Sequence, residues 1–251
     1  MAVRWYVIFA VLATLAFLLY AANRIWWPAS DAGRKPVPRA VAGPAPGKAA
    51  PPAAAPAWLV SRDEALAAYR GQRYQEALDA CGRAVALAAT AGQAQQALAL
   101  VTCGGLTVMQ PSALVQTEDW LKQAVAITQK LGQQAIVAAL GPREALLKER
   151  CLRTLGVYYR DRGRPGEAAE NLALAVDTVR AMPPPETADR RLALRSDLFD
   201  LGVALGQLGY RGTALRAFAE SREYYLETEP GSPALKAIAE QQRRLGAPRG
   251  N

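Results

Sequence analysis

The sequence predicts an all-α protein: a solenoid of stacked helical hairpins, preceded by a single transmembrane helix and a disordered Pro/Ala-rich linker. Three observations support this. Apolar residues make up 51% of the 251-residue chain, with helical spacing and few runs of the strand type. An uninterrupted apolar stretch lies close to the amino terminus, and a proline-rich stretch separates it from the helical body.

The segment 152–175 contains the clearest helical hairpin. Its first helix places a set of residues at i, i+3, i+4 and i+7 on one face: Leu152, Leu155, Gly156 and Tyr159. Gly163 then breaks the helix, and Pro165 suits the first turn of the next helix, where a missing N–H costs nothing. Small residues at Gly156 and Ala168 would let the two antiparallel helices touch closely.

This pattern resembles the tetratricopeptide repeat (TPR), whose signature is W-x2-L-G-x2-Y…A-x3-F. Leu152 stands in place of the Trp, and Leu172 in place of the Phe. A second good copy consists of Leu198, Leu201, Gly202, Leu205, Ala214 and Phe218. Two weaker copies lie upstream: Ala65, Ala68, Ala77, Cys81 and Ala84, and then Val101, Gly105, Val108, Thr117, Leu121 and Ala124.

In all four copies the small residue of the first helix precedes that of the second by 12 positions. The copies start about 40 to 50 residues apart, against the 34 of the standard unit. This spacing resembles the long-helix variety found in kinesin light chains and many bacterial repeat proteins. The resemblance spans Trp58 to Leu245, and it implies a curved stack of hairpins that binds other proteins.

The run Trp5–Ala22 is 18 residues long, enough to span a bilayer as a helix. Aromatic residues at both ends would lie at the membrane interfaces: Trp5, Tyr6, Trp26 and Trp27. A cleaved signal peptide is the alternative, but it would place Tyr20 where a small residue is preferred, at −3 of a cut after Ala22. We therefore expect an uncleaved single-pass anchor.

Residues 28–57 form the predicted linker, which contains eight prolines between Pro28 and Pro56. Proline favours an extended polyproline II conformation, so the segment would reach on the order of 90 Å at about 3.1 Å per residue. It would act as a spacer that holds the body away from lipid, or as a neutral tether without a required length.

The predicted domain boundaries are 1–27 for the anchor, 28–57 for the linker, 58–245 for about four repeats plus a capping helix, and 246–251 for a disordered tail. Within the body we expect four repeats: Trp58–Ala89, Gln93–Leu131, a third repeat that ends at Arg180, and Asp189–Glu227. We also expect a short extra helix at Gln134–Ala139 and a capping helix at Ala234–Leu245. Leu235, Ile238 and Ala239 of the capping helix would cover the last repeat.

The side of the membrane is less clear from the charges. Two positive groups, Arg4 and the amino terminus, precede the apolar run, and four basic residues follow it: Arg24, Arg34, Lys35 and Arg39. Because positive charge is enriched on the cytoplasmic side of a membrane, this count favours a cytoplasmic body. A short basic tail before an apolar helix and an Ala/Pro spacer are typical of bacterial envelope proteins. We favour an extracytoplasmic body on a bacterial inner membrane.

Charge and residue content argue against catalysis, metal binding and nucleic-acid binding. The chain contains no histidine, which removes His ligands and the commonest general base. Of the net charge of +8, residues 1–60 carry +5 because they contain six basic residues and one acidic residue. The rest of the chain has nearly equal numbers of basic and acidic residues, so its charge does not predict a surface that binds nucleic acid. We expect no enzyme activity, no cofactor, no metal and no small-molecule substrate.

The three cysteines, Cys81, Cys103 and Cys151, form no C-x-x-C motif. Buried thiols that pack between helices are the simplest interpretation. A disulfide between Cys81 and Cys103 is the alternative, because both residues fall near one junction between repeats.

In TPR proteins, ligands usually bind in the concave groove that the first helices line. Groove positions carried over to this sequence are Arg62, Tyr69, Arg70, Thr102, Met109, Gln110, Arg150, Arg153, Arg160, Phe199 and Gln207. Their five arginines would favour an acidic peptide or a carboxyl terminus, because guanidinium binds carboxylate through two hydrogen bonds. The alternative is that these arginines form a solvated face with partners at i,i+4. The asparagines of the carboxylate-clamp TPR subset are missing.

The sequence thus predicts a membrane-anchored adaptor that binds a protein or peptide, with an acidic ligand as one option, and supports assembly of a membrane or envelope complex. A structural spacer or self-associating protein is the alternative. A carboxylate-based enzyme using Glu149 or Glu167 is a remote one, because neither glutamate has an evident partner.

Overall fold

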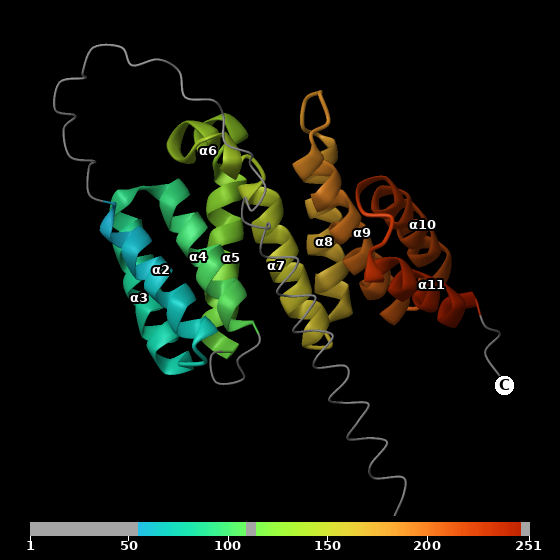
Figure 1. Cartoon of the computed structure of the whole chain (residues 1–251), viewed down its shortest axis with the longest axis horizontal. Helices are drawn as coiled ribbons and strands as arrows, with labels where there is room; N and C mark the ends of the chain where they lie inside the picture. Colours follow the sequence, from blue (N-terminus) through green and yellow to red (C-terminus); the bar gives the residue numbers. More distant parts are fainter. Residues whose placement is uncertain (1–54, 109–113, 247–251) are drawn as a thin grey trace, which may run out of the picture. The chain divides into compact units, whose positions relative to one another are not determined.

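The structure, a computed structural model, describes residues 55–108 and 114–246, and across them it contains helices and no strand (Figure 1). The all-α body is confirmed. The elements are α2 (Ala57–Arg70), α3 (Tyr74–Ala91), α4 (Gln93–Thr107), α5 (Leu114–Lys130), α6 (Gln133–Leu140), the 3-10 helix η2 (Pro142–Glu144), α7 (Leu147–Asp161), α8 (Pro165–Arg180), α9 (Ala188–Gln207), α10 (Arg211–Thr228) and α11 (Pro233–Gly246).

The predicted anchor and linker lie outside the described residues, as do Trp5, Tyr6, Trp26 and Trp27. In the part of the chain that is described, no helix combines the length and the apolar character needed to cross a bilayer.

Four helical hairpins form the body: α2 with α3, α4 with α5, α7 with α8, and α9 with α10. Each hairpin packs on the next one along the chain, through α3 against α4, α5 against α7, and α8 against α9. All described residues belong to one compact unit, 53–251. Three residues join the two helices in the first, third and fourth hairpins, and a left-handed glycine follows the first helix in two of them, with φ of 70° at Gly163 and 82° at Gly209.

Glycine sets the close approach of the helices in the third and fourth hairpins. A Cβ atom added at Gly156 would lie 2.7 Å from Leu172 Cγ, and one added at Gly202 would lie 2.8 Å from Phe218 Cε1. Both distances are well inside van der Waals contact. Leu172 and Phe218 therefore fill the space that a missing side chain leaves on the facing helix, as the repeat pattern predicts.

The second hairpin differs from the prediction by one residue. The contact glycine is Gly104, where an added Cβ would lie 2.5 Å from Leu121 Cδ2, whereas Gly105 is only half-buried. Gly104 precedes its contact residue by 17 positions, but Gly156 and Gly202 precede theirs by 16. Six residues, 108–113, connect α4 to α5, whereas three residues connect the helices of the third and fourth hairpins. The hydroxyl of Thr117 donates to that of Thr107 at 2.7 Å.

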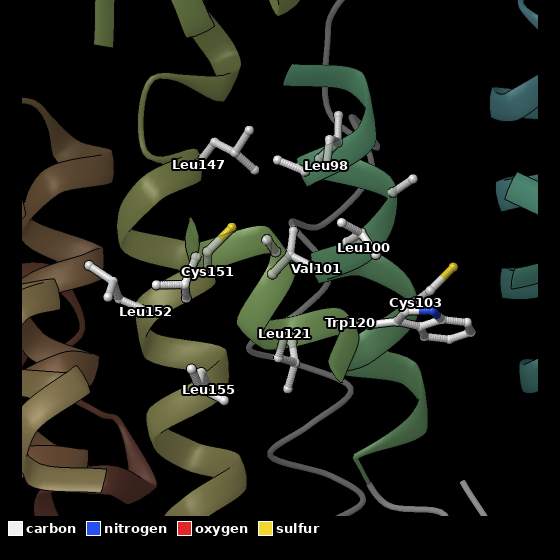
Figure 2. Close-up of a cluster of buried hydrophobic side chains, with 14 of the residues drawn as sticks. Leu98, Leu100, Val101, Cys103, Trp120, Leu121, Leu147, Cys151, Leu152 and Leu155 are labelled. Carbon is white, nitrogen blue, oxygen red and sulfur yellow. The ribbon is translucent and has the colours of Figure 1, made fainter. Parts of the chain in front are cut away.

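The core is continuous through the second and third hairpins. Leucine and valine side chains of α4 and α5 meet leucines of α7 in one apolar cluster (Figure 2). Cys81, Cys103 and Cys151 are all buried and free, so the packing-thiol interpretation is confirmed and no Cys81–Cys103 disulfide is present. Burial raises the pKa of the Cys151 thiol to about 12, as expected for an inert core thiol.

Two further helices complete the unit. The short helix α6 lies where an extra helix was expected and buries Ile136. The capping helix α11 buries Ile238, with Leu235 partly buried against the last hairpin. Ala239 was expected to share that face but is exposed, because it follows Ile238 by one residue and so points about 100° away around the helix.

Arg190 organises the proline-rich loop between α8 and α9, a role that the sequence pattern did not reveal. Its side chain is 8% exposed and donates hydrogen bonds to four carbonyl oxygens, those of Val179, Met182, Pro183 and Pro185. Val179 lies in the last turn of α8, whose final carbonyls lack partners inside the helix. Arg190 thus closes the end of α8 and fixes the loop that follows.

We predict that Gly156→Ala destabilises the protein by about 1 to 3 kcal/mol, because the added methyl group overlaps Leu172 in a packed core. Gly82→Ala is the matched control, since nothing lies within 4 Å of a Cβ at that helical glycine. The control should raise stability by about 0.5 to 1 kcal/mol through helix propensity. Urea unfolding followed by circular dichroism measures both, and equal effects of the two changes would contradict the close contact.

Candidate functional site

The arginines that the groove prediction places on α7 pair with carboxylates of the neighbouring hairpin. Arg153 donates to Asp200 Oδ2 at 3.1 Å, and Arg160 donates to Asp200 Oδ1. Arg153 Nε also lies 3.2 Å from Asp197 Oδ1. Since both aspartates lie on α9, these contacts join the first helices of the third and fourth repeats. We call this group, Glu149, Arg153, Arg160, Asp197 and Asp200, the α7–α9 charge cluster.

The cluster is largely removed from water. The side chains of Arg153 and Arg160 are 21% and 19% exposed, whereas those of Asp197 and Asp200 are 0% and 9% exposed. Burial lowers the pKa of the Arg153 guanidinium, but the carboxylates of Asp200, Asp197 and Glu149 outweigh burial and raise it. Both guanidinium groups therefore stay charged, and their positive charge is compensated within the fold.

Two carboxyl groups of the cluster, those of Glu149 and Asp197, have raised pKa values. Burial raises the pKa of Glu149, and this increase exceeds the lowering by Arg153. Burial also raises the pKa of Asp197 well above its ordinary value, and the neighbouring Glu149 raises it further. Their side chains lie within hydrogen-bonding reach of each other, while Asp200 accepts the direct hydrogen bonds of both arginines.

Arg150, the third arginine predicted on α7, forms an ion pair with Glu144 of η2. None of the three pairs with an acid at i+4 on its own helix. Arg160 has one local partner, Asp161, to which its Nε donates at 2.9 Å. All three predicted arginines of α7 thus have carboxylate partners.

The predicted residues of the first repeat lie closer to the surface. The Arg62 side chain is 26% exposed, pairs with Asp63 at 2.7 Å and lies over the Trp58 ring. Tyr69 meets Tyr74 edge to face, with ring centroids 5.6 Å apart. Arg70 is exposed near the end of α2. Three of the predicted groove positions therefore gather on α2.

The remaining predicted positions are divided among other surroundings. Phe199 packs edge to face on Phe218, at 5.8 Å between centroids, in the apolar cluster that α11 covers. The Thr102 hydroxyl donates to the carbonyl of Leu98 one turn earlier. Gln207 is exposed at the end of α9, and Met109 and Gln110 lie outside the described residues. Phe199 is thus part of the core of the last repeat.

A second polar network joins α5, α7 and α8. The Arg164 guanidinium stacks on Tyr159, with 4.3 Å between its carbon and the ring centroid, and donates to both Glu118 oxygens at 3.0 and 3.1 Å. Hydrogen bonds from Lys122 and then from Arg164 lower the pKa of Glu118. Glu167, a glutamate considered for catalysis, pairs with Arg164 in the same network.

Sequence reasoning missed Asp197 and Asp200. The signal was present, because two aspartates three residues apart in the middle of a helix share one face and are poor helix formers. Apart from these two aspartates the stretch 197–205 is apolar, and aspartate in such a stretch indicates a buried partner. The described residues contain no group of three or more His, Cys, Asp or Glu side chains placed to hold a metal ion.

The chain matches no protein-family model and no curated protein. Solved structures do match. The crystal structure of nearly identical TPR-like repeats of a Podosopora anserina kinesin light chain is similar with a TM-score of 0.54 at 16% identity, over 74% of this chain and 84% of that one. A crystal structure of a substituted form of those repeats gives a TM-score of 0.56 at 18% identity, over the same shares. These likenesses confirm the TPR-like solenoid fold.

We predict that Asp200→Ala destabilises the protein by about 2 to 3 kcal/mol, because it leaves two largely buried guanidinium groups without their shared partner. Asp63→Ala is the control: it removes the exposed partner of Arg62 and should cost less than about 1 kcal/mol. Chemical unfolding of both variants measures the difference. A loss for Asp200→Ala no larger than that for Asp63→Ala would rule out the structural role of the charge cluster.

Proposed function

We propose that this protein is a membrane-tethered interaction module, whose TPR-like repeats hold a protein or peptide partner and support assembly of a membrane or envelope complex. The observation that carries the proposal is the stack of four helical hairpins, each packed on the next. Such repeats bury a shared core and leave extended surfaces, which repeat proteins use for binding. The TPR-like solved structures support the fold on which the proposal rests.

The partner surface that fits best is on α2. The arginines of α7 already have carboxylate partners, so an acidic ligand would have to displace Asp200 to bind them. On α2, Arg62 pairs with Asp63, but both side chains contact solvent, at 26% and 64% exposed, so a ligand can replace this partner at little cost. Arg70 is exposed, and Tyr69 precedes it in the sequence. We therefore place the contact with an acidic segment of the partner at the amino-terminal end of the solenoid.

The tether rests on the sequence of residues 1–57. An apolar run with aromatic residues at both ends fits a bilayer span, and a proline-rich segment after it fits a spacer between lipid and repeats. This order would present the repeats to a partner near the membrane, and we favour the extracytoplasmic side of a bacterial inner membrane.

We expect the full chain to stay in the membrane fraction after alkaline carbonate extraction, and a chain lacking residues 1–27 to become soluble. A reporter fused after Asn251 should be accessible from the extracytoplasmic side. Edman or mass-spectrometric determination of the amino terminus is the control. A mature chain that begins after Ala22, or a full chain that carbonate releases, would contradict the tether.

We expect Arg62→Glu with Arg70→Glu to lower partner recovery at least about tenfold, because charge-assisted contacts to carboxylates become repulsive. The measurement is affinity capture of detergent-solubilised full-length protein, quantified by mass spectrometry. Arg216→Glu with Arg222→Glu is the matched control, since it makes the same charge change on exposed residues of α10. A peptide rich in Asp and Glu should compete with the partner for the unmodified protein.

Equal recovery by the two double variants would remove the α2 surface from the proposal. If no partner is captured and the mass of the protein rises with its concentration in ultracentrifugation, self-association replaces the adaptor function.

A further inference from the structure

The α7–α9 charge cluster contains more carboxyl groups than guanidinium groups. Three carboxyls, Glu149, Asp197 and Asp200, face Arg153 and Arg160. Arg160 also forms an ion pair with Asp161, so its charge does not fully compensate a further buried carboxylate in addition to Asp200. With every group ionised, the cluster would hold an excess negative charge in a place with little water, which is strongly unfavourable.

The groups around the cluster do not remove this excess. From α7, Arg150 is already paired with Glu144. From α9, Arg195 lies 3.4 Å from Glu229 and stacks on the Tyr225 ring of α10 at 4.6 Å. Tyr225 faces Arg153 as well, and burial raises its pKa, so it remains a neutral phenol. The surrounding charged groups are therefore paired with one another.

Hydrogen-bond geometry identifies the carboxyls that lack a donor. Asp200 accepts from both arginines, whereas the two fully buried oxygens of Asp197 accept no hydrogen bond from the described residues. Arg153 Nε lies 3.2 Å from Asp197 Oδ1, but this ion pair lacks hydrogen-bond geometry, and Asp197 Oδ2 has no cation of the described residues against it. Glu149, which is 6% exposed, lies within hydrogen-bonding reach of Asp197. Two ionised carboxylates cannot hydrogen-bond to each other, because both only accept. A single proton between them would supply the missing donor and remove the excess charge.

We propose that Glu149 and Asp197 hold one shared proton in the folded protein, and that its loss at higher pH weakens the junction between the third and fourth repeats. The carboxyl O–H of one residue donates to the carboxylate of the other, and Arg153 balances the charge that remains. Release of the proton to water leaves two buried carboxylates in contact on adjacent helices. The junction between α7 and α9 thus becomes less stable as the solution becomes more alkaline.

The direction of the pH effect follows from the raised pKa values of the pair. Carboxyls that bind a proton more tightly when folded add stability at low pH, and this stability is lost as the pH rises through their folded pKa. Glu118, Glu167 and Glu240 act in the opposite direction, because hydrogen bonds from basic residues lower their pKa values. The contribution of the pair is therefore distinguishable by its sign.

The test compares the full chain with Glu149→Gln and with Asp197→Asn, in thermal unfolding from about pH 5 to about pH 9. An amide supplies the donor at every pH and cannot release a proton. Relative to the unmodified protein, each variant should therefore gain stability as the pH rises, and the alkaline decline should be lost. Glu170→Gln, which alters an exposed acid of α8, should keep the pH profile of the unmodified protein.

Infrared spectroscopy of the unmodified protein tests the same proposal without a variant. A neutral buried carboxyl has a carbonyl stretching band that is separate from those of carboxylates and amides, and it shifts in deuterated water. We expect this band near neutral pH, and we expect it to disappear in alkaline solution. Absence of the band, or pH profiles of Glu149→Gln and Asp197→Asn that match that of Glu170→Gln, would overturn the proposal.

Discussion

The close approach of two antiparallel helices at a glycine is the constraint on which the structure depends. At Gly156 and Gly202 the facing side chains Leu172 and Phe218 occupy the space where a Cβ would lie. This contact fixes the distance between the helices of a hairpin and leaves their outer faces to pack on the next hairpin. Because a single hairpin cannot bury its apolar faces alone, the stack forms as a unit.

The polar contacts between hairpins add a second level of organisation. Arg153 and Arg160 on α7 meet Asp197 and Asp200 on α9, so the first helices of neighbouring repeats are joined by charge as well as by apolar packing. A buried ion pair adds little net stability, but removing one partner leaves a buried charge without compensation. The positive charge of the α7 arginines is therefore compensated within the fold.

Much of the fold could be predicted from the sequence, because glycine, proline and apolar spacing act locally. The Gly156 and Gly202 contacts, the break before α9 and the capping helix all follow from such patterns. The Gly104 contact did not, because the spacing rule assumes a connection of constant length, and six residues connect α4 to α5 where three connect the helices of the third and fourth hairpins. The site was harder to predict: offsets along one helix place Arg153 on a face, but only the packing of α7 on α9 brings Asp200 to it.

The proline loop between α8 and α9 has a consequence for how the chain tolerates change. Surface connections usually accept insertions and deletions, because their backbone groups bond to water. Here four carbonyl oxygens around the loop converge on the single guanidinium of Arg190. Adding or removing a residue would displace carbonyls from that guanidinium and leave a buried cation poorly solvated. The length of this connection is thus as constrained as a core position, and natural variation or domain insertion should concentrate in the other turns.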